Sequence, residues 1–328
     1  MKIFLTGATG FIGKHLVRVL LQQGHQVVCL VRDIKKLDAD VASRVEVIRG
    51  DLSLFADASL VLPEVDVVVH LAAVIAGKNE AEYASINFDA VKDLLASLRR
   101  QSWQPKRFIF ASSLAAAGPS HGDVAHTEDD DVAPIDPYGQ AKANAEKLMR
   151  DQPFATTSFR PPIVLGAGDP ATLTLYKMAR SRIAFLPAGR PQRLSFIAVS
   201  DLVRAILLMA NDTSDAHRVY YVTNEQVMTN RKLLFAMAHA LSPMTQRSLR
   251  IMPVPHLALH AAMHMATSAS ALFGFKNQLD RKQLNQMLAP SFVCTSARLT
   301  KDTGWVAEVS LEAATIEAVK GYREAGLL

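Results

Sequence analysis

Cysteine is nearly absent from this sequence, and its scarcity narrows the class of protein. The 328 residues include two cysteines, Cys29 and Cys294, which lie far apart. A small secreted domain held together by disulfides needs several closely spaced cysteines, so that class is excluded. Cys29 falls within an apolar run, which predicts a buried thiol and fits a reducing compartment. We therefore expect a cytoplasmic protein with a large apolar core.

Dense basic runs are also missing, as are zinc-finger and helix-turn-helix patterns. The net charge is +5 and the isoelectric point is near 9.2. A mildly basic balance suits an anionic cofactor and gives little support for nucleic-acid binding. We expect a small-molecule substrate as the partner and no nucleic acid.

Charged residues are absent from positions 251–275, which is the longest such gap. Two prolines, three histidines and several hydroxyl side chains argue against a membrane span, and we expect no signal peptide. The preferred interpretation is a helix over the substrate cleft or at a subunit contact. A peripheral membrane helix and a zinc site at His256, His260 and His264 are the alternatives.

The first residues form the most informative stretch. Lys2–Leu5 is an aliphatic run typical of a strand buried on both faces. A glycine-rich turn follows, and then apolar residues at helical spacing until Gly24. In this order, backbone amides at the helix N-terminus can bind a pyrophosphate. The cofactor-binding residues predicted in this turn are Gly7, Thr9, Gly10, Phe11, Ile12 and Gly13.

Further apolar runs alternate with helical segments through the first half of the chain. The other expected strands are Gln26–Val31, Val45–Ile48, Val65–Leu71, Arg107–Ala111 and Thr157–Phe159, with helices over Ile86–Leu98 and Asp136–Met149. Continuous apolar strands separated by helices predict an α/β fold, with a doubly wound parallel sheet covered on both faces. Ligands of such a sheet bind beyond the carboxyl ends of its strands.

The alternation ends near Arg160, where prolines and glycines form a junction. We predict a NAD(P)-binding domain over residues 1–162 and a smaller, mainly substrate-binding lobe over 163–328. Elements near 195–222 are expected to return to the main sheet. The expected later elements are strands at Ser195–Val199 and Val219–Val222 and helices at Ser200–Met209 and Arg231–Leu241.

Tyr138 and Lys142 form the second informative pattern, Tyr-x-x-x-Lys. Asp136 is a favourable N-cap and Pro137 a favourable first helical residue, so Tyr138 falls in the first turn and Lys142 shares its face. A phenol has a pKa of about 10. An adjacent ammonium group and a helix N-terminus would lower that pKa toward neutrality. Tyr138 is therefore a candidate general acid/base.

Together these motifs resemble the extended short-chain dehydrogenase/reductase family, also called NAD(P)-dependent epimerase/dehydratase-like. The matching segments are TGATGFIG, FIFASS with Gly118, Thr127-Glu128, Pro134, Tyr138-x-x-x-Lys142, Arg160-Pro161-Pro162, Ser195-Phe196-Ile197 with Asp201, and a weaker match at Leu299–Trp305. The resemblance covers residues 1 to about 222. It implies a NAD(P)-binding Rossmann fold and a homodimer.

The resemblance also assigns roles to residues. Ser113, with Ser112 as the alternative, would hydrogen-bond the reacting oxygen, and Tyr138 would be the general acid/base. Lys142 would bind the nicotinamide ribose and lower the tyrosine pKa. The other predicted cofactor contacts are Asp51, Leu52, Leu71, Ala72, Ala73, Asn87 and Pro162. No metal ligand is expected in this site.

The end of the second strand bears on the choice of cofactor. NAD enzymes of this fold place an acid there to bind the ribose 2′-hydroxyl. Here Val31 is followed by Arg32, whose guanidinium suits a 2′-phosphate, and Lys36 adds positive charge. Asp33 would reach the ribose if the turn differed by one residue. The sequence favours NADP, with NAD as the alternative.

Departures from the family pattern narrow the reaction. Leu114-Ala115 stands where sugar-nucleotide dehydratases carry an acidic pair, and Ile163 stands where many sugar-nucleotide epimerases carry asparagine. The segment Val74-Ile75-Ala76 is also apolar. These features resemble the hydroxysteroid dehydrogenase-like and dihydroflavonol reductase-like branches.

The predicted function is an NADP-dependent oxidoreductase that interconverts a secondary alcohol and a ketone on an apolar or mixed small molecule. One alternative is a sugar-nucleotide epimerase that works through a transient keto intermediate. The other is a non-catalytic NAD(P)-binding regulatory or assembly protein, against which the complete Ser-Tyr-Lys set argues.

Overall fold

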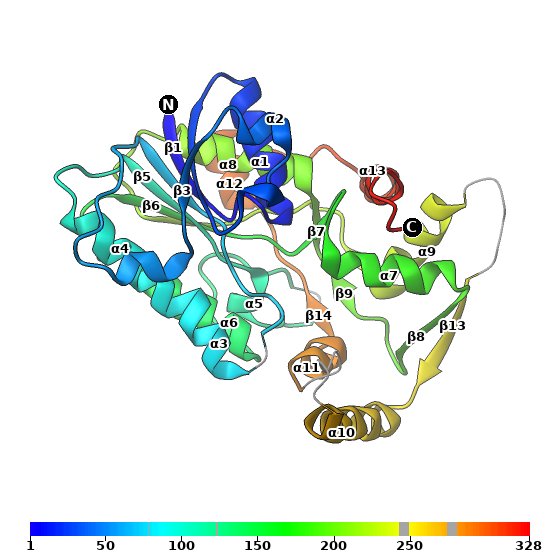
Figure 1. Ribbon diagram of the computed structural model, residues 1–328. Coiled ribbons are helices and arrows are strands. Elements are labelled where there is room, and N and C mark those ends of the chain that lie inside the picture. Colours follow the sequence, from blue (N-terminus) through cyan, green and yellow to red (C-terminus); the bar gives the residue numbers. More distant parts are fainter. Residues whose placement is uncertain (78, 123, 243–248, 274–280) are drawn as a thin grey trace.

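The computed structural model describes residues 1–77, 79–122, 124–242, 249–273 and 281–328. The chain forms a sheet-based lobe and a second lobe built mainly from the C-terminal half (Figure 1). Cys29 is a buried free thiol, as predicted, and Cys294 is a second one. Within the described part of the chain, no helix is both long enough and apolar enough to cross a bilayer.

A seven-stranded parallel sheet forms the centre of the first lobe. Its order is β11-β6-β5-β4-β1-β2-β3. The strands are β1 (Lys2–Thr6), β2 (Gln26–Val31), β3 (Glu46–Arg49), β4 (Val67–His70), β5 (Arg107–Ala111), β6 (Ala155–Arg160) and β11 (Arg218–Tyr221). The chain reverses its direction of travel between β1 and β4, so the carboxyl ends of these two strands flank the ligand-binding crevice of a doubly wound sheet. The predicted α/β fold class is confirmed.

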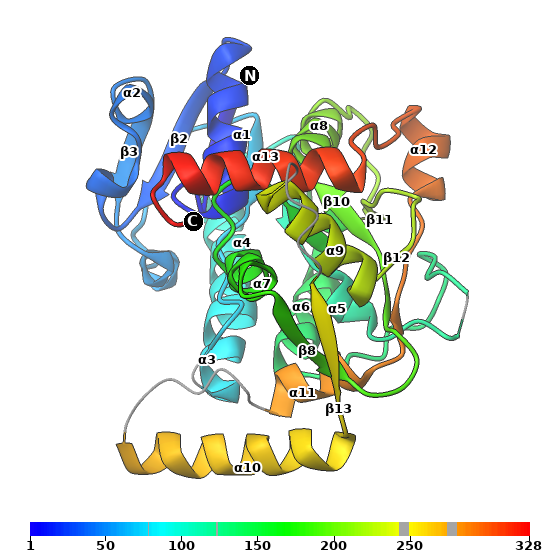
Figure 2. The ribbon, with the colours of Figure 1, turned by 90° about the vertical axis from the view of Figure 1, so that its right-hand side faces the viewer.

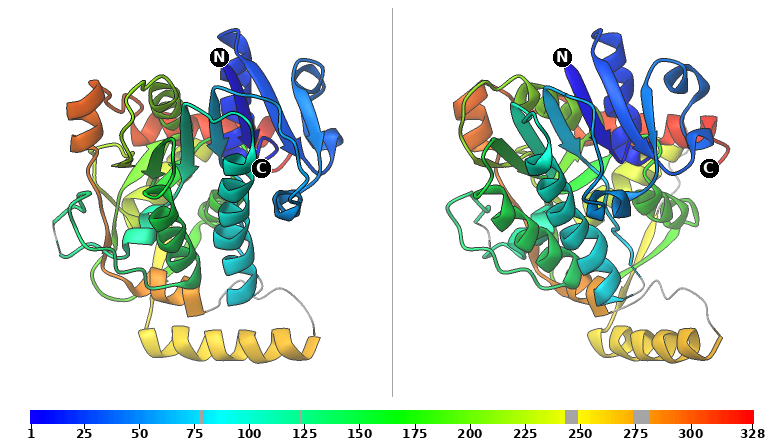
Figure 3. Two further views of the ribbon diagram at one scale, coloured as in Figure 1. Left: turned by 90° about the vertical axis from the view of Figure 1, so that its left-hand side faces the viewer. Right: turned by 60° about the vertical axis from the view of Figure 1, so that its left-hand side comes forward.

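Helices cover both faces of this sheet. One face packs against α1 (Phe11–Gln22) and α8 (Val199–Ala210), and Trp305 after α12 (Ala297–Thr303) joins the same apolar core. The other face packs against α4 (Ala90–Arg100) and α6 (Pro137–Met149), which lie side by side in Figure 3. Shorter segments at the strand ends are the 3-10 turns η1 (Ile34–Lys36) and η2 (Leu52–Ala56), α2 (Ala39–Ala42) and α5 (Leu114–Ala117).

The second lobe combines small sheets with helices. Its strand pairs are β7 (Ile163–Leu165) with β10 (Phe196–Ala198), and β8 (Ile183–Pro187) with β13 (Arg250–Val254). A three-stranded sheet contains β12 (Met228–Thr229), β9 (Arg193–Leu194) and β14 (Ser291–Phe292). Its helices are α7 (Pro170–Arg180), α9 (Asn230–Leu241), α10 (His256–Phe273), α11 (Arg281–Leu288) and α13 (Leu311–Glu324). In Figure 2, α13 crosses above α9 and α10 forms the opposite edge.

Three expected elements differ from the structure. The predicted helix Ile86–Leu98 is the later part of a longer one, which begins with α3 (Glu80–Ala84) and passes through a π-helical turn (Ser85–Asp89) into α4. The strand predicted over Val65–Leu71 is shorter and spans Val67–His70, although the Leu71 amide still donates to the Thr6 carbonyl at 3.2 Å. The strand at Ser195–Val199 pairs with β7 instead of the main sheet, whereas α8 and β11 do return to the first lobe.

Candidate active site

The glycine-rich turn between β1 and α1 leaves no room for side chains. Gly7 has φ +80°, and a Cβ there would lie 2.7 Å from the Ala72 amide nitrogen. A Cβ on Gly13 would lie 2.0 Å from the Gly7 carbonyl oxygen. Any larger residue at these positions would have to displace backbone. The turn therefore holds β1, α1 and the segment after β4 close together at the carboxyl edge of the sheet.

The N-terminus of α1 has the donors that a pyrophosphate needs. Gly10 is the N-cap and supplies no side chain to the first turn. The first helical hydrogen bond runs from the Lys14 amide to the Gly10 carbonyl at 2.9 Å. The amides of residues 11–13 precede that bond and so have no acceptor within the helix. With the close-packed glycines, this cradle fits a dinucleotide.

Arg32 lies at the exposed end of β2, next to the end of β3. Asp33 caps η1, because its Oδ1 accepts a hydrogen bond from the Lys35 amide at 3.0 Å. Asp51 caps η2, and hydrogen bonds from Ser53 hold its pKa below the usual value, with a smaller contribution from the Arg32 charge. The structure thus brings Arg32 and Asp51 together. It also engages one carboxylate oxygen of Asp33 in the cap of η1.

The predicted contacts after β4 line the same edge. Leu71, Ala72 and Ala73 are half-buried beside the glycine turn. Asn87 is buried in the π-helical turn, where its amide accepts from the Val74 N–H at 3.0 Å and donates to the Val74 carbonyl at 2.9 Å. Its role is to hold the loop that follows Ala73, because both polar ends of its side chain bind that loop.

Tyr138 occupies the first turn of α6, as its capping residues predict. The Asp136 Oδ1 accepts from the Gly139 amide at 3.0 Å. The Ser113 hydroxyl hydrogen-bonds the Tyr138 phenol, and it also accepts from the Ala115 amide at 3.1 Å. The hydroxyl of Ser112, the alternative serine, is buried without a hydrogen-bond partner among the described residues. The structure therefore pairs Ser113, and not Ser112, with the tyrosine.

The Tyr138 pKa is the clearest correction to the sequence analysis. Burial raises it to about 12, and the Ser113 hydrogen bond opposes that effect. The expected lowering by Lys142 is wrong for this structure. The ammonium lies 6.0 Å from the centre of the tyrosine ring and bonds elsewhere. Removing the phenol from water outweighs the effect of the helix N-terminus, so Tyr138 is protonated and able to donate.

Lys142 is buried below the tyrosine. Its Nζ donates to the Ala111 carbonyl at 2.7 Å and lies 4.7 Å from the centre of the Phe110 ring. Burial lowers the pKa of Lys142 to about 7, and the negative charge of Glu146 opposes that shift. Lys142 can therefore change protonation near neutral pH, beside a tyrosine that does not.

Sequence reasoning missed several residues that support this site. Glu146 stands one turn after Lys142 and forms a buried bidentate pair with Arg160, at 2.8 and 2.6 Å. Tyr83 packs edge-on against Tyr138, with ring centres 6.3 Å apart. His70 ends β4 and is hydrogen-bonded through Nδ1 to Thr6 at 2.8 Å. The i, i+4 spacing from Lys142 was the only signal for Glu146, and the other two contacts depend on distant segments.

Pro162 joins β6 to β7 and is half-buried near the carboxyl ends of the strands. The neighbouring Pro161 carbonyl accepts from the Leu114 amide at 2.9 Å, which holds this junction against the serine-bearing turn.

The uncharged segment forms helix α10 after Pro255, although residues 274–275 lie outside the described chain. Among the described residues, no three His, Cys, Asp or Glu side chains gather to bind a metal, so the histidines of α10 form no zinc site there.

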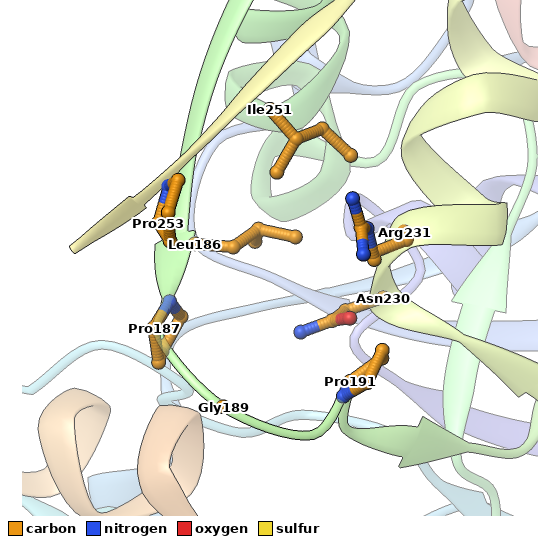
Figure 4. A pocket seen from close by; sticks show the side chains of 8 residues that line it. All are labelled: Leu186, Pro187, Gly189, Pro191, Asn230, Arg231, Ile251 and Pro253. Carbon is orange, nitrogen blue, oxygen red and sulfur yellow. The ribbon is translucent and has the colours of Figure 1, made fainter. Parts of the chain in front are cut away.

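A separate small cavity of about 120 Å³ lies in the second lobe, between the β8–β13 pair and the start of α9. Figure 4 shows Leu186 and Ile251 pointing across it toward Arg231. The Asn230 Oδ1 there is buried without a partner among the described residues. None of the predicted site residues lines this cavity, so the serine, tyrosine and lysine remain the candidate active site.

Comparison with known proteins bears on this arrangement. The sequence profile described as NAD dependent epimerase/dehydratase family matches residues 3–222. A UDP-glucose 4-epimerase of Vibrio cholerae is 30% identical over 266 residues, which cover 77% of this chain and 78% of that protein. A ceramide reductase of Caulobacter vibrioides is 29% identical over 233 residues, which cover 68% of this chain and 67% of that protein.

Solved structures agree in fold. The UDP-glucose 4-epimerase of Thermus thermophilus, in complex with NAD, matches with a TM-score of 0.75 over 99% of this chain and 100% of its own. The identity is 19%, so this likeness concerns the fold alone.

Proposed function

Because the chain belongs to the NAD-dependent epimerase/dehydratase family of extended short-chain dehydrogenases/reductases, we propose that it is an NADP-dependent reductase of a ketone on an apolar or mixed small molecule. The observation that carries the proposal is the assembly of Ser113, Tyr138 and Lys142 at the carboxyl edge of the sheet. Beside them lie an apolar loop and the N-terminus of α1, whose first turn has no side-chain cap. The relatives include both reductases and epimerases, and the site chemistry serves either.

The reduction needs one hydride and one proton. A reduced nicotinamide cofactor, held by the glycine-rich turn at the N-terminus of α1, would supply the hydride to the carbonyl carbon. Tyr138, protonated because of its raised pKa, gives its proton to the carbonyl oxygen as the C=O π bond breaks. Ser113 donates a hydrogen bond to the same oxygen and so stabilises the charge that develops there. Lys142 would bind the nicotinamide ribose, and a proton taken up from water would restore the Tyr138 phenol after each turnover.

NADP is the proposed cofactor because of Arg32. Its exposed guanidinium stands where the adenosine ribose of a dinucleotide lies in this fold, and Lys36 follows in η1. Asp33 is engaged in capping η1, which weakens it as a ribose ligand. The proposed contacts otherwise remain those of the sequence analysis, in a NAD(P)-binding domain over 1–162 and a substrate lobe over 163–328.

An apolar substrate is supported by the loop beside the tyrosine. Val74-Ile75-Ala76 follows β4, and the Tyr83 hydroxyl donates to the Ile75 carbonyl at 3.3 Å. The side chain of Ile75 is exposed beside the packed rings of Tyr83 and Tyr138. A relative named ceramide reductase acts, by its name, on a lipid. We further propose a homodimer, as the family resemblance implies, and a cytoplasmic location, which fits the scarce, buried cysteines.

The first test is calorimetric titration with NADPH and with NADH. We expect NADPH to bind at least about tenfold more tightly, which corresponds to about 1.4 kcal/mol. Arg32→Glu should remove that preference, whereas Arg150→Glu, a matched charge reversal at an exposed site on the far end of α6, should not. A preference for NADH would identify Asp33 as the ribose ligand and contradict the NADP assignment.

The second test is turnover. Oxidation of NADPH is measured with aliphatic, 3-oxoacyl and steroid ketones, and activity should rise with the apolar surface of the ketone.

The second candidate function, favoured by the Vibrio cholerae relative, is a sugar-nucleotide epimerase. It predicts conversion of UDP-glucose to its 4-epimer with no net change in reduced nicotinamide. Binding of neither cofactor would instead support the non-catalytic alternative.

A further inference from the structure

The second lobe extends into a projecting arm. It consists of β8, β13 and α10, and we call it the α10 arm. The two strands pair in parallel, with Phe185 opposite Met252. The His256 Nε2 donates to the Ala188 carbonyl at 3.0 Å, which ties the start of α10 to the end of β8. In every view, α10 forms one extreme edge of the molecule (Figures 1–3).

The two strands of the arm have one covered face and one open face. Leu186 and Ile251 point toward α9 across the small cavity (Figure 4). Because side chains alternate along a strand, the opposite face carries Ile183, Phe185 and Met252. These three apolar side chains are exposed, Phe185 to 58%. Exposed large apolar residues gathered on one element indicate a contact surface.

Helix α10 repeats this division. Leu259, Met263 and Ala266 share one helical face, on which Met263 is buried. Leu257, Ala261 and Met265 follow one another at i, i+4 spacing on the other side. Leu257 is 82% exposed and Met265 is 67% exposed. An apolar stripe therefore runs along the outside of the helix, which lacks any charged residue.

The charges around the arm have one sign. Residues 170–200 contain five basic residues and no acidic one, and residues 226–279 contain five more and again no acidic one. The whole chain has 36 basic and 31 acidic residues. Outside these two stretches the acidic residues therefore outnumber the basic ones, and the positive net charge comes from the two stretches. Among the residues that the structure describes, no carboxylate pairs with the exposed Arg180, Arg182, Arg190 or Arg250.

We propose that the α10 arm docks the protein on an anionic lipid surface, with the outer stripe of α10 inserted among the headgroups. The apolar stripe supplies burial, and the surrounding arginines supply attraction to negative headgroups. A second copy of the chain is the less suitable occupant, because the exposed arginines at and beside the strands of two arms, among them Arg182 and Arg250, would repel one another. The docking does not depend on the proposed reaction.

The test is co-sedimentation of the full-length protein with phosphatidylcholine vesicles, with and without phosphatidylglycerol. We expect at least a tenfold higher partition coefficient on the vesicles that contain phosphatidylglycerol, and a decrease on these vesicles as salt increases. Equal partition on both vesicle types, or no binding to either, overturns the proposal.

Two double variants make the assignment specific. Leu257→Glu/Met265→Glu should reduce vesicle binding at least tenfold. Val61→Glu/Ile316→Glu changes two other exposed apolar residues to glutamate elsewhere on the surface, and it should bind vesicles like the parent. Thermal melting confirms that both are folded, and Leu257→Ser/Met265→Ser replaces the first variant if it is not.

Light scattering separates lipid from self-association. If Leu257→Glu/Met265→Glu converts a dimer into a monomer and the parent protein does not bind vesicles, the arm is a subunit interface and the proposal is overturned. Cofactor binding is measured on the same samples. If an arm variant loses vesicle binding and keeps its affinity for NADPH, the effect is confined to the arm. Failure of the docking proposal therefore appears in vesicle binding, whereas failure of the proposed function appears in cofactor binding.

Discussion

The carboxyl edge of the main sheet and the α10 arm both contain long stretches without charge, yet apolar side chains are buried at the edge and exposed on the arm. All four residues of β4 are buried between two helical layers. In the arm, Phe185, Leu257 and Met265 face outward. The same composition therefore produces a core in one place and an exposed surface in the other, because helices cover both faces of the main sheet and leave one side of the arm open.

Polar groups differ in the same way. At the carboxyl edge several of them are buried and paired, as Lys142 is with the Ala111 carbonyl and Glu146 with Arg160. Around the arm, basic side chains are exposed. This comparison predicts that substitutions at the edge change chemistry and stability strongly, whereas substitutions on the outside of the arm change neither and affect only what the surface contacts.

The largest effect is expected at Tyr138. Tyr138→Phe removes the proton donor and should lower turnover roughly 10²- to 10⁴-fold, the usual range for a general acid/base. NADPH affinity and vesicle binding should stay close to those of the parent, as measured by calorimetry and co-sedimentation. A large loss of cofactor affinity in this variant would contradict the assigned role.

The next largest effect is expected at the buried ion pair. Glu146→Ala leaves the Arg160 guanidinium buried without its partner and should destabilise the fold by about 3–5 kcal/mol. The control is Glu46→Ala, which breaks the exposed pair with Lys2 and should cost less than about 1 kcal/mol. Urea unfolding measures both. Similar values for the two variants would show that burial does not set the strength of this pair.

A third prediction concerns pH. Burial lowers the pKa of His70 to about 3, and the positive charge of Lys142 adds to that effect. In the unfolded chain the histidine has a pKa of about 6.5, so below that pH it binds a proton that His70 does not bind in the folded chain. This contribution to stability is complete above pH 6.5 and declines as pH falls, by about 2 kcal/mol between pH 6.5 and 5.

His70→Gln should abolish that decline, whereas His239→Gln, at an exposed position on α9, should preserve it. Unfolding free energies at a series of pH values provide the measurement. Parallel pH curves for the parent and His70→Gln would exclude His70 as the source of acid sensitivity.

The smallest effect is expected on the outside of the arm. Leu257→Ser exchanges an exposed side chain and should change the free energy of unfolding by no more than about 0.5 kcal/mol. Turnover of a water-soluble ketone should also be unchanged. Chemical denaturation and steady-state kinetics check both. A destabilisation above about 2 kcal/mol would mean that Leu257 is packed in solution, and the contrast between the edge and the arm would disappear.

Local features of the candidate site were predictable from the sequence. The Gly7–Gly13 turn, the Asp136 cap and the shared face of Tyr138 and Lys142 depend on residues within one or two helical turns of each other, and the structure places them as expected. The buried thiol of Cys29 and the doubly wound sheet follow from apolar runs of the right length.

The sequence by itself determined which elements form and which residues reach the carboxyl edge of the sheet, because strands, helix caps and i, i+4 spacing are local. Only the tertiary structure decided the raised Tyr138 pKa, the pairing of Glu146 with Arg160, and the exposure of the apolar stripe on α10. Each of these depends on how much water neighbouring elements exclude. That quantity is set by segments far apart in the chain, which no local pattern encodes.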